Sequence, residues 1–213
     1  PQNYSLVLRD TASSVARIDT VKLVYTNNAG CADSITRYFT IYPQLEGYIK
    51  PQPVTSACDS FPVQFSDSIK TKGNFTWKWD FGDGATNITS QMPKHIFRNK
   101  GQNDTTYKTY FYTYSYYGCK DTDSVSFVIY PYIKAAFGVD TSKGCGPLNI
   151  TIKNNAIGPV TTYTWDYGDG NPLSANSDQQ HIYQYNNNTA AALNYTLKQR
   201  VENSHSCADS LLR

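Results

Sequence analysis

The chain has 213 residues, a formal net charge of +2, and only 17% charged residues with no basic or acidic block. This balance argues against nucleic acid or an anionic membrane surface as a partner. No apolar run is long enough to span a bilayer. Tyrosine is abundant at 18 residues, and it favours strands because it fits a half-buried pleated surface. Since no segment has helical hydrophobic spacing, we expect an all-β fold.

Three groups of alternating residues predict strands, in chain order, ahead of a recurring cysteine. Before Cys31 they are Val21, Leu23 and Tyr25; before Cys119 they are Thr109, Phe111 and Thr113; before Cys207 they are Leu197, Gln199 and Val201. Two further alternating runs precede a Trp-Asp-aromatic-Gly-Asp-Gly hexapeptide, namely Phe61, Val63 and Phe65, then Leu148, Ile150 and Ile152. Period-two alternation is typical of strands with one buried face.

These markers recur with a period near 88 residues. Cys31, Cys119 and Cys207 follow one another at intervals of 88, and Ile41-Tyr42-Pro43 returns as Ile129-Tyr130-Pro131 at the same interval. A fixed period of this size indicates repeats. We expect residues 1–43 to be the C-terminal part of one repeat, residues 44–131 a complete repeat, and residues 132–213 a repeat without its last strand. Both ends of the sequence suggest that it is cut from a longer polypeptide.

The five cysteines fit this division. Each of the two longer repeats has an early cysteine (Cys58, Cys145) and a late cysteine (Cys119, Cys207). We predict the disulfides Cys58–Cys119 and Cys145–Cys207, and a partner for Cys31 outside the sequence. Disulfides require an oxidising compartment, so we expect an exported protein. Zinc is the alternative, but the three histidines and the cysteines lack the short ligand spacing of zinc sites.

The hexapeptides carry a family resemblance. Trp79–Gly84 has the sequence Trp-Asp-Phe-Gly-Asp-Gly, and Trp165–Gly170 differs only in Tyr167. This motif resembles that of PKD domains, the immunoglobulin-like modules named after the polycystic kidney disease protein. The sequences beginning at His95 and His181 fit the family's mid-repeat strand. The resemblance implies tandem β-sandwich repeats in an extended rod. Combined with the Gly-Cys-x-Asp-Ser segments, it is similar to long surface proteins of Bacteroidota.

Each hexapeptide residue also has a physical interpretation. The tryptophans should fill the sandwich cores because they have the largest apolar surface. The glycines permit positive φ, and the aspartates can accept backbone N–H groups in the turn. These structural-motif residues are Trp79, Asp80, Gly82, Asp83, Gly84, Trp165, Asp166, Gly168, Asp169 and Gly170. A weaker hypothesis is calcium binding at Asp80 and Asp83; otherwise we expect no metal and no cofactor. Nothing beside these carboxylates indicates a nucleophile, so we expect no catalytic residue and no enzyme.

One aromatic stripe is a candidate binding surface. Tyr110, Tyr112, Tyr114 and Tyr116 alternate along the strand that precedes Cys119, opposite its expected core side. An aromatic stripe can bind sugars, a partner protein or an adjacent repeat. Ordinary cross-strand pairing is the alternative.

The tripeptide Asp-Ser/Thr-apolar resembles an O-glycosylation motif of exported bacterial proteins. Its hydroxyl residues here are Thr11, Thr20, Ser34, Ser68, Ser124 and Ser210. Half of these sites lie beside a late cysteine, where the Asp-Ser pair could instead serve the turn.

Together these features predict a non-catalytic stalk or adhesive segment of a large secreted cell-surface protein. Its expected partners are neighbouring repeats, copies of itself, or surface glycans and proteins, with no nucleic acid and no membrane span. A carbohydrate- or protein-binding accessory module of a secreted hydrolase is the alternative.

Overall fold

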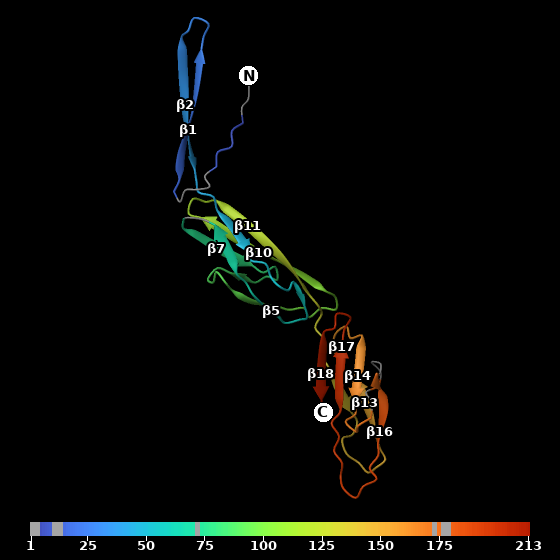
Figure 1. Ribbon diagram of the computed structural model, residues 1–213. Coiled ribbons are helices and arrows are strands. Elements are labelled where there is room, and N and C mark those ends of the chain that lie inside the picture. The colour runs from blue at the N-terminus through green and yellow to red at the C-terminus, as the bar shows by residue number, and fades with distance from the viewer. Residues whose placement is uncertain (1–4, 10–14, 71–72, 172–173, 176–179) are drawn as a thin grey trace. The chain divides into compact units, whose positions relative to one another are not determined.

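The computed structural model describes residues 5–9, 15–70, 73–171, 174–175 and 180–213. The described residues form strands and no helix, so the predicted all-β class is confirmed (Figure 1). They divide into two compact units. Unit 1 comprises Pro1–Pro53, Gln64–His95 and Tyr107–Ser126, and unit 2 comprises Val54–Val63, Ile96–Thr106 and Phe127–Arg213. Both units take residues from the middle segment, 44–131. The two predicted repeat boundaries, at residues 44 and 132, stay a prediction.

The N-terminal strands of unit 1 form an isolated antiparallel hairpin. Strand β1 (Arg17–Thr26) pairs with β2 (Ala32–Ile41) from Arg17↔Ile41 to Thr26↔Ala32 (Figure 1). Val21, Leu23 and Tyr25 alternate as predicted but are exposed, because in the described part of the chain this sheet consists of β1 and β2 alone.

The middle segment contains a five-stranded sheet in the order β4-β11-β10-β7-β8. The two pairs β3-β6 and β5-β9 accompany it. The bounds are β3 (Glu46–Ile49), β4 (Ser56–Ala57), β5 (Phe61–Gln64), β6 (Asp67–Lys70), β7 (Phe75–Asp80), β8 (Thr86–Asn87), β9 (Lys94–Phe97), β10 (Thr105–Ser115) and β11 (Lys120–Ile129). Thr109, Phe111 and Thr113 of β10 are fully buried, which confirms the predicted core side of that strand.

The C-terminal segment of unit 2 contains a three-stranded sheet, β12-β13-β16, and a four-stranded sheet, β15-β14-β17-β18. Their bounds are β12 (Phe137–Val139), β13 (Leu148–Asn154), β14 (Thr162–Asp166), β15 (Ser174–Ala175), β16 (His181–Tyr185), β17 (Lys198–Glu202) and β18 (Ala208–Leu212). A core cluster draws buried residues from both sheets: Phe137, Ile150, Ile152, Trp165, Tyr167 and Leu197. This is the arrangement of a β-sandwich, in which the inward faces of two sheets share one core.

Both hexapeptide tryptophans are fully buried, as predicted. The ring of Trp79 lies 5.0 Å from that of Phe65 and 4.4 Å from that of Phe111, measured between centroids. The Trp165 ring meets Phe137 edge-on at 5.2 Å. Such large buried rings dominate the apolar area of a small core, so each tryptophan fixes the sandwich strands around it.

Candidate functional sites: aromatic turns, a disulfide joint and a tyrosine face

The first hexapeptide forms a tight turn closed by its own aspartates. Asp80 Oδ1 accepts the Gly82 N–H at 3.1 Å, and Asp83 Oδ1 accepts the Ala85 N–H at 3.0 Å. Gly82 has a φ of 81°, a left-handed conformation that costs other residues free energy. A Cβ atom on Gly82 would also lie 2.4 Å from the Lys108 carbonyl oxygen. Gly82 is therefore required both by the backbone conformation and by the space.

The second hexapeptide repeats this turn. Asp166 Oδ1 accepts the Gly168 N–H at 2.9 Å, and Asp169 Oδ1 accepts the Asn171 N–H at 3.1 Å. Gly168 has a φ of 73°, and a Cβ atom there would lie 2.5 Å from the Thr196 carbonyl oxygen. The two aspartates of each motif thus stabilise their turn, as the motif predicts.

A ring from a later strand, β9 in the first case and β16 in the second, covers each turn. In the first, His95 stacks on Phe81 at 4.0 Å between centroids, and its Nε2 lies 2.6 Å from Asp83 Oδ2. In the second, Tyr183 stacks on Tyr167 at 3.5 Å and its hydroxyl donates to Asp169 Oδ2 at 2.5 Å. A polar ring therefore links the aromatic residue of the hexapeptide to its second aspartate in both turns.

The structure matches His95 with Tyr183 and not with His181, although similar sequences begin at the two histidines. The Phe65 N–H bonds to the Pro93 carbonyl, whereas Ile152 pairs with His181. Pro93 and His181 therefore hold matching positions, so His95 corresponds to Tyr183. His181 instead approaches Trp165 edge-on at 5.2 Å and contacts the Tyr167 hydroxyl through Nε2 at 3.1 Å. The shared His-Ile letters concealed a shift of two residues, which keeps each side chain on the same face of the strand.

The second turn is also an electrostatic cluster. Burial raises the pKa of Asp169, but hydrogen bonds from Tyr183 and Asn171 outweigh it, and the net pKa of this carboxyl lies below its ordinary value. The pKa of Tyr183 is raised, first by burial and then by its bond to Asp169. Burial raises the pKa of the neighbouring Tyr185 to about 12. Both phenols therefore stay protonated at neutral pH and can donate hydrogen bonds.

The turn carboxylates bear on the calcium hypothesis. Both oxygens of Asp83 and both of Asp169 have protein partners. Within the described residues, no group of three or more His, Cys, Asp or Glu side chains is arranged to hold a metal ion. Calcium usually takes six to eight oxygen ligands, so these contacts favour the turn-stabilising interpretation of Asp80 and Asp83.

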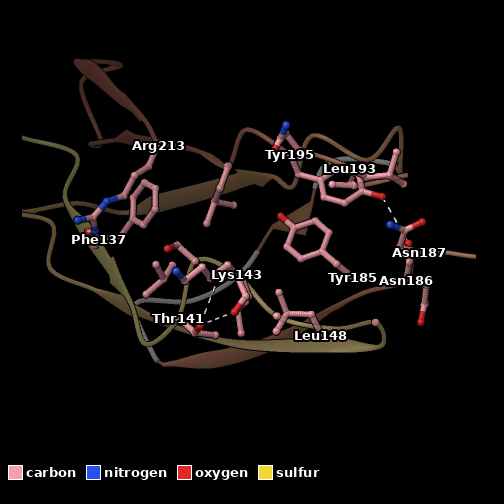
Figure 2. A pocket seen from close by; sticks show the side chains of 18 residues that line it. Phe137, Thr141, Lys143, Leu148, Tyr185, Asn186, Asn187, Leu193, Tyr195 and Arg213 are labelled. Atoms are coloured by element: carbon pink, nitrogen blue, oxygen red, sulfur yellow. Dashed lines mark hydrogen bonds between the residues drawn. The ribbon is translucent and has the colours of Figure 1, made fainter. Parts of the chain in front are cut away.

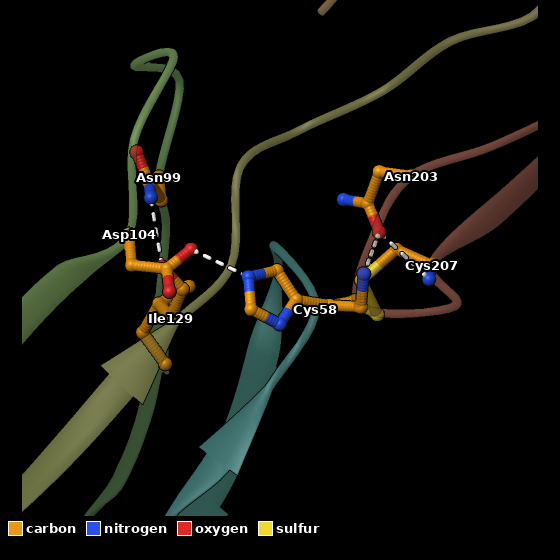
Figure 3. The surroundings of a disulfide bond; sticks show 7 residues. Cys58, Asn99, Asp104, Ile129, Asn203 and Cys207 are labelled. Atoms are coloured by element: carbon orange, nitrogen blue, oxygen red, sulfur yellow. Dashed lines mark hydrogen bonds and ion pairs between the residues drawn. A yellow bond between two sulfur atoms is a disulfide. The ribbon is translucent and has the colours of Figure 1, made fainter. Parts of the chain in front are cut away.

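The structure pairs the cysteines differently from the sequence prediction. Cys58 bonds to Cys207, with a Cα–Cα distance of 5.7 Å and a sequence separation of 149 (Figure 3). Cys31, Cys119 and Cys145 are not in disulfides. The predicted pairs Cys58–Cys119 and Cys145–Cys207 are therefore wrong.

The length of β11 is the physical reason. Cys119 directly precedes β11, whereas Cys58 directly follows Ala57, which pairs with Ile129 at the far end of the same strand. Ten strand residues span roughly 30 Å, and a disulfide needs Cα atoms within about 7 Å. The early cysteine of the middle segment therefore meets the late cysteine of the next segment.

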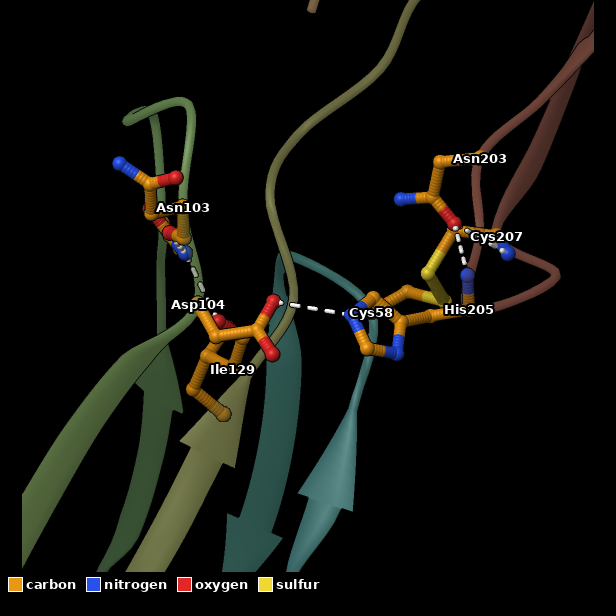
Figure 4. Close-up of polar contacts among 8 residues, drawn as sticks. Cys58, Asn103, Asp104, Ile129, Asn203, His205 and Cys207 are labelled. Atoms are coloured by element: carbon orange, nitrogen blue, oxygen red, sulfur yellow. Dashed lines mark hydrogen bonds and ion pairs between the residues drawn. A yellow bond between two sulfur atoms is a disulfide. The ribbon is translucent and has the colours of Figure 1, made fainter. Parts of the chain in front are cut away.

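Around this bond lie contacts that we call the disulfide joint, made by Cys58, Cys207, Tyr130, His205 and Asp104. The Tyr130 and His205 rings stack at 3.9 Å with planes 3° apart. His205 Nε2 lies 3.1 Å from Asp104 Oδ1 (Figure 4). The sequence analysis missed these partners. The sequence did contain a signal for the two rings, because aromatic residues recur at the repeat interval. Tyr42 precedes Tyr130, and Tyr117 precedes His205, by 88 residues.

The backbone beside Cys58 is held as well. The N–H groups of Val128 and Tyr130 donate to the carbonyls of Thr55 and Ala57, both at 2.8 Å, which makes β4 a short parallel neighbour of β11. Asn99 donates from its side-chain Nδ2 to the Ile129 carbonyl at 2.7 Å (Figure 3). The joint is thus fixed by backbone pairing, ring stacking and a covalent bond.

Three of the four stripe tyrosines lie where the sequence placed them. Tyr110, Tyr112 and Tyr114 are half-buried on the face of β10 opposite its core residues. Across the strand pair they face Asp80, Lys78 and Thr76 of β7. Tyr110 and Tyr112 stack at 5.9 Å. Tyr116 is different, because β10 ends at Ser115 and Tyr116 lies in the following turn, 83% exposed.

The candidate glycosylation sites share exposure. Thr20, Ser34, Ser68, Ser124 and Ser210 are all exposed, and Thr11 lies outside the described residues. Asp209, which precedes Ser210, accepts the Ala135 N–H at 2.8 Å, and Asp121 accepts the Gly47 N–H at the same distance. The aspartates after the late cysteines therefore also serve the fold. Modification of the hydroxyls remains a prediction.

A pocket of about 410 Å³ opens at the end of the C-terminal segment. Leu148, Tyr185, Leu193 and Tyr195 are among its lining residues (Figure 2). In the middle segment, Phe61 and Phe97 match Leu148 and Tyr185, and Phe127 lies between them at 6.4 Å and 5.0 Å. The equivalent space in the middle segment therefore holds the Phe127 ring. We assign it no ligand.

Residues 43–127 match the family model of the PKD domain. PKD domains are generally non-catalytic and typically extracellular, and the match supports a structural or binding module. The described residues include no helix long and apolar enough to cross a membrane. No curated protein matches the chain.

Several solved structures resemble the chain weakly. The fibronectin(III)-like modules of Clostridium thermocellum CbhA are 12% identical, with a TM-score of 0.33 over 78% of this chain and 91% of that one. SGBP-B of Bacteroides ovatus, solved with a mixed-linkage heptasaccharide, is 12% identical with a TM-score of 0.31 over 78% and 46%. A tetra-tandem repeat from the extending region of a large adhesion protein is 13% identical with a TM-score of 0.29 over 93% and 56%. At these TM-scores none of them bears on function.

The two glycines of the first turn predict different tolerance to alanine. Gly84 has a φ of 93° but open space around its Cβ position, so Gly84→Ala should lower the free energy of unfolding by about 1–2 kcal/mol. Gly82→Ala adds the clash with the Lys108 carbonyl and should cost about 3 kcal/mol or more. Urea unfolding followed by circular dichroism compares the two variants. Equal losses would show that the close backbone approach is not a constraint.

The lowered pKa of Asp169 predicts a pH-dependent contribution to stability. A carboxyl whose folded pKa lies below its unfolded value of about 3.9 stabilises the fold above that pH, and the effect is lost as pH falls through the folded pKa. The stability difference between the wild type and Asp169→Asn should therefore be constant at neutral pH and shrink below about pH 4. Tyr183→Phe should raise the Asp169 pKa measured by NMR titration. An unchanged pKa would remove the phenol as its cause.

Proposed function

We propose that the chain is a non-catalytic structural segment of a secreted cell-surface protein, built from tandem PKD-like repeats with boundaries at residues 44 and 132. The observation that carries the proposal is the disulfide joint. Cys58 and Cys207 belong to different predicted repeats, and their bond limits the movement of one against the other. Such a bond suits a spacer, which must hold its neighbouring repeats together and resist force.

Equivalent contacts in the two longer segments support the repeat division. Gly47 and Ala135 lie 88 residues apart and donate their N–H groups to Asp121 and Asp209, which are separated by the same interval. The rings of Tyr42 and Tyr117 stack at 4.7 Å, and those of Tyr130 and His205 stack in the same way. Repeats that contact mainly their neighbours form extended arrays.

The disulfide supports the proposed extracellular location. Disulfides persist in oxidising environments and are rare in reducing ones. In the chain-entropy model, a link between residues 149 apart stabilises the folded state by about 5 kcal/mol relative to an unfolded loop. Covalent closure of this kind suits a segment exposed to proteases and mechanical load.

Small-angle X-ray scattering of the oxidised chain tests the array. A single compact domain of this length would have a radius of gyration of about 17 Å. Repeats arranged end to end should give more than about 25 Å, because the largest distances then run along several domains. A value near 17 Å would contradict the spacer proposal.

Glycan binding on the tyrosine face is the second candidate. Tyr110, Tyr112 and Tyr114 offer half-exposed rings on one sheet face, and aromatic rings with a polar tip suit mixed apolar and polar contacts. A glycan array probed with the intact chain tests it. Binding that is lost in Tyr112→Ala/Tyr114→Ala, and kept in the off-face control Tyr116→Ala, would support this candidate. No binding to any glycan would count against it.

A further inference from the structure

Cys119 occupies a turn that matches the turn of the bonded Cys207. The Cys207 N–H donates to Asn203 Oδ1 at 3.0 Å, and its carbonyl accepts the Asn203 N–H at 3.0 Å. The Cys119 N–H donates to Ser115 Oγ at 3.1 Å, and its carbonyl accepts the Ser115 N–H at 2.9 Å. The preceding residues, Gly118 and Ser206, both have positive φ, at 82° and 61°.

The surroundings of Cys119 match as well. Beside Cys207, the ring of His205 stacks on Tyr130, the residue that follows β11. Beside Cys119, Tyr117 stacks on Tyr42, the residue after β2, at 4.7 Å with planes 14° apart. Unit 1 therefore contains a ring contact equivalent to that of the disulfide joint. In both cases a cysteine lies two residues after the second ring.

Among the described residues, the early cysteine of the joint has no counterpart near Cys119. Next to Tyr130, β4, which directly precedes Cys58, pairs in parallel with the end of β11. The strand that corresponds to β11 is β2, which ends directly before Tyr42. Among the described strands, β2 pairs with β1 alone. No described strand pairs with its other edge near Ile41, and an open strand edge is a template for another strand.

We propose that Cys119 is a disulfide site for an early cysteine of a preceding repeat, carried on a short strand that pairs in parallel with the end of β2. This inference rests on the proposed tandem repeats and deepens them. Each joint would then be closed by the early cysteine of one repeat and the late cysteine of the next. Cys58–Cys207 is one such bond, and Cys119 is the late cysteine of the joint before it.

The chemistry requires an oxidant, for which we specify a small-molecule disulfide such as oxidised glutathione. The thiolate of one cysteine attacks oxidised glutathione, forming a mixed disulfide and releasing one reduced glutathione. The second thiolate then displaces the other glutathione. The two cysteines lose two electrons and two protons in total, and one oxidised glutathione becomes two reduced molecules.

An extended chain tests this site. Residues 44–88 are placed ahead of Pro1, so that residues 1–43 complete a repeat with its own copy of Cys58. After oxidation with glutathione, alkylation and non-reducing digestion, mass spectrometry should find the added cysteine linked to Cys119. A link from the added cysteine to Cys31, or an alkylated Cys119, would overturn the proposal. Either result can be compared with scattering of the same sample, which tests the array separately.

A peptide in trans keeps the test independent of whether the extended chain folds. The unmodified chain is incubated with oxidised glutathione and the peptide of residues 54–64, which contains β4 and Cys58. Cys31 is the matched control, because its turn is alike but it has Ala29 where Cys119 has Tyr117. Relative to a scrambled peptide, the mixed disulfide should favour Cys119 over Cys31 several-fold. Equal ratios for both peptides would contradict the proposal.

Discussion

The bond between Cys58 and Cys207 is the constraint on which the other contacts of the joint depend. It ties the segment after β4 to the turn between β17 and β18, and it brings His205 under the ring of Tyr130 and beside Asp104. A stacked ring pair alone contributes about 1 kcal/mol, and a partly exposed ion pair contributes less. The covalent link holds these weak contacts together, because it keeps the turn that carries His205 beside the segment that carries Cys58.

Within each sandwich the corresponding anchor is the tryptophan and the turn that follows it. Trp79 and Trp165 fill the cores, and Gly82 and Gly168 let the chain reverse against the backbone of the neighbouring strand. The ring that covers the turn is His95 in one case and Tyr183 in the other. Each ring contacts the second aspartate of its own hexapeptide. The position therefore requires a flat ring with a polar end rather than one residue type.

The sequence predicted the features that depend on local pattern. Alternation identified the buried face of β10 and the buried Leu197, Gln199 and Val201 of the C-terminal segment, and the hexapeptide predicted its turn bonds. Cysteine pairing failed because it depends on which ends of the strands meet, and spacing within one repeat carries no such information. The end of β10 at Ser115, which removes Tyr116 from the tyrosine face, was likewise hidden by continuing alternation of tyrosines.

Peptide mapping of the oxidised chain under non-reducing conditions tests the joint most directly. After alkylation of free thiols and proteolysis, one linked species should contain the peptides of Cys58 and Cys207, and Cys31, Cys119 and Cys145 should all be alkylated. A species linking Cys58 to Cys119, or Cys145 to Cys207, would mean that each sandwich closes on itself, and it would contradict the joint.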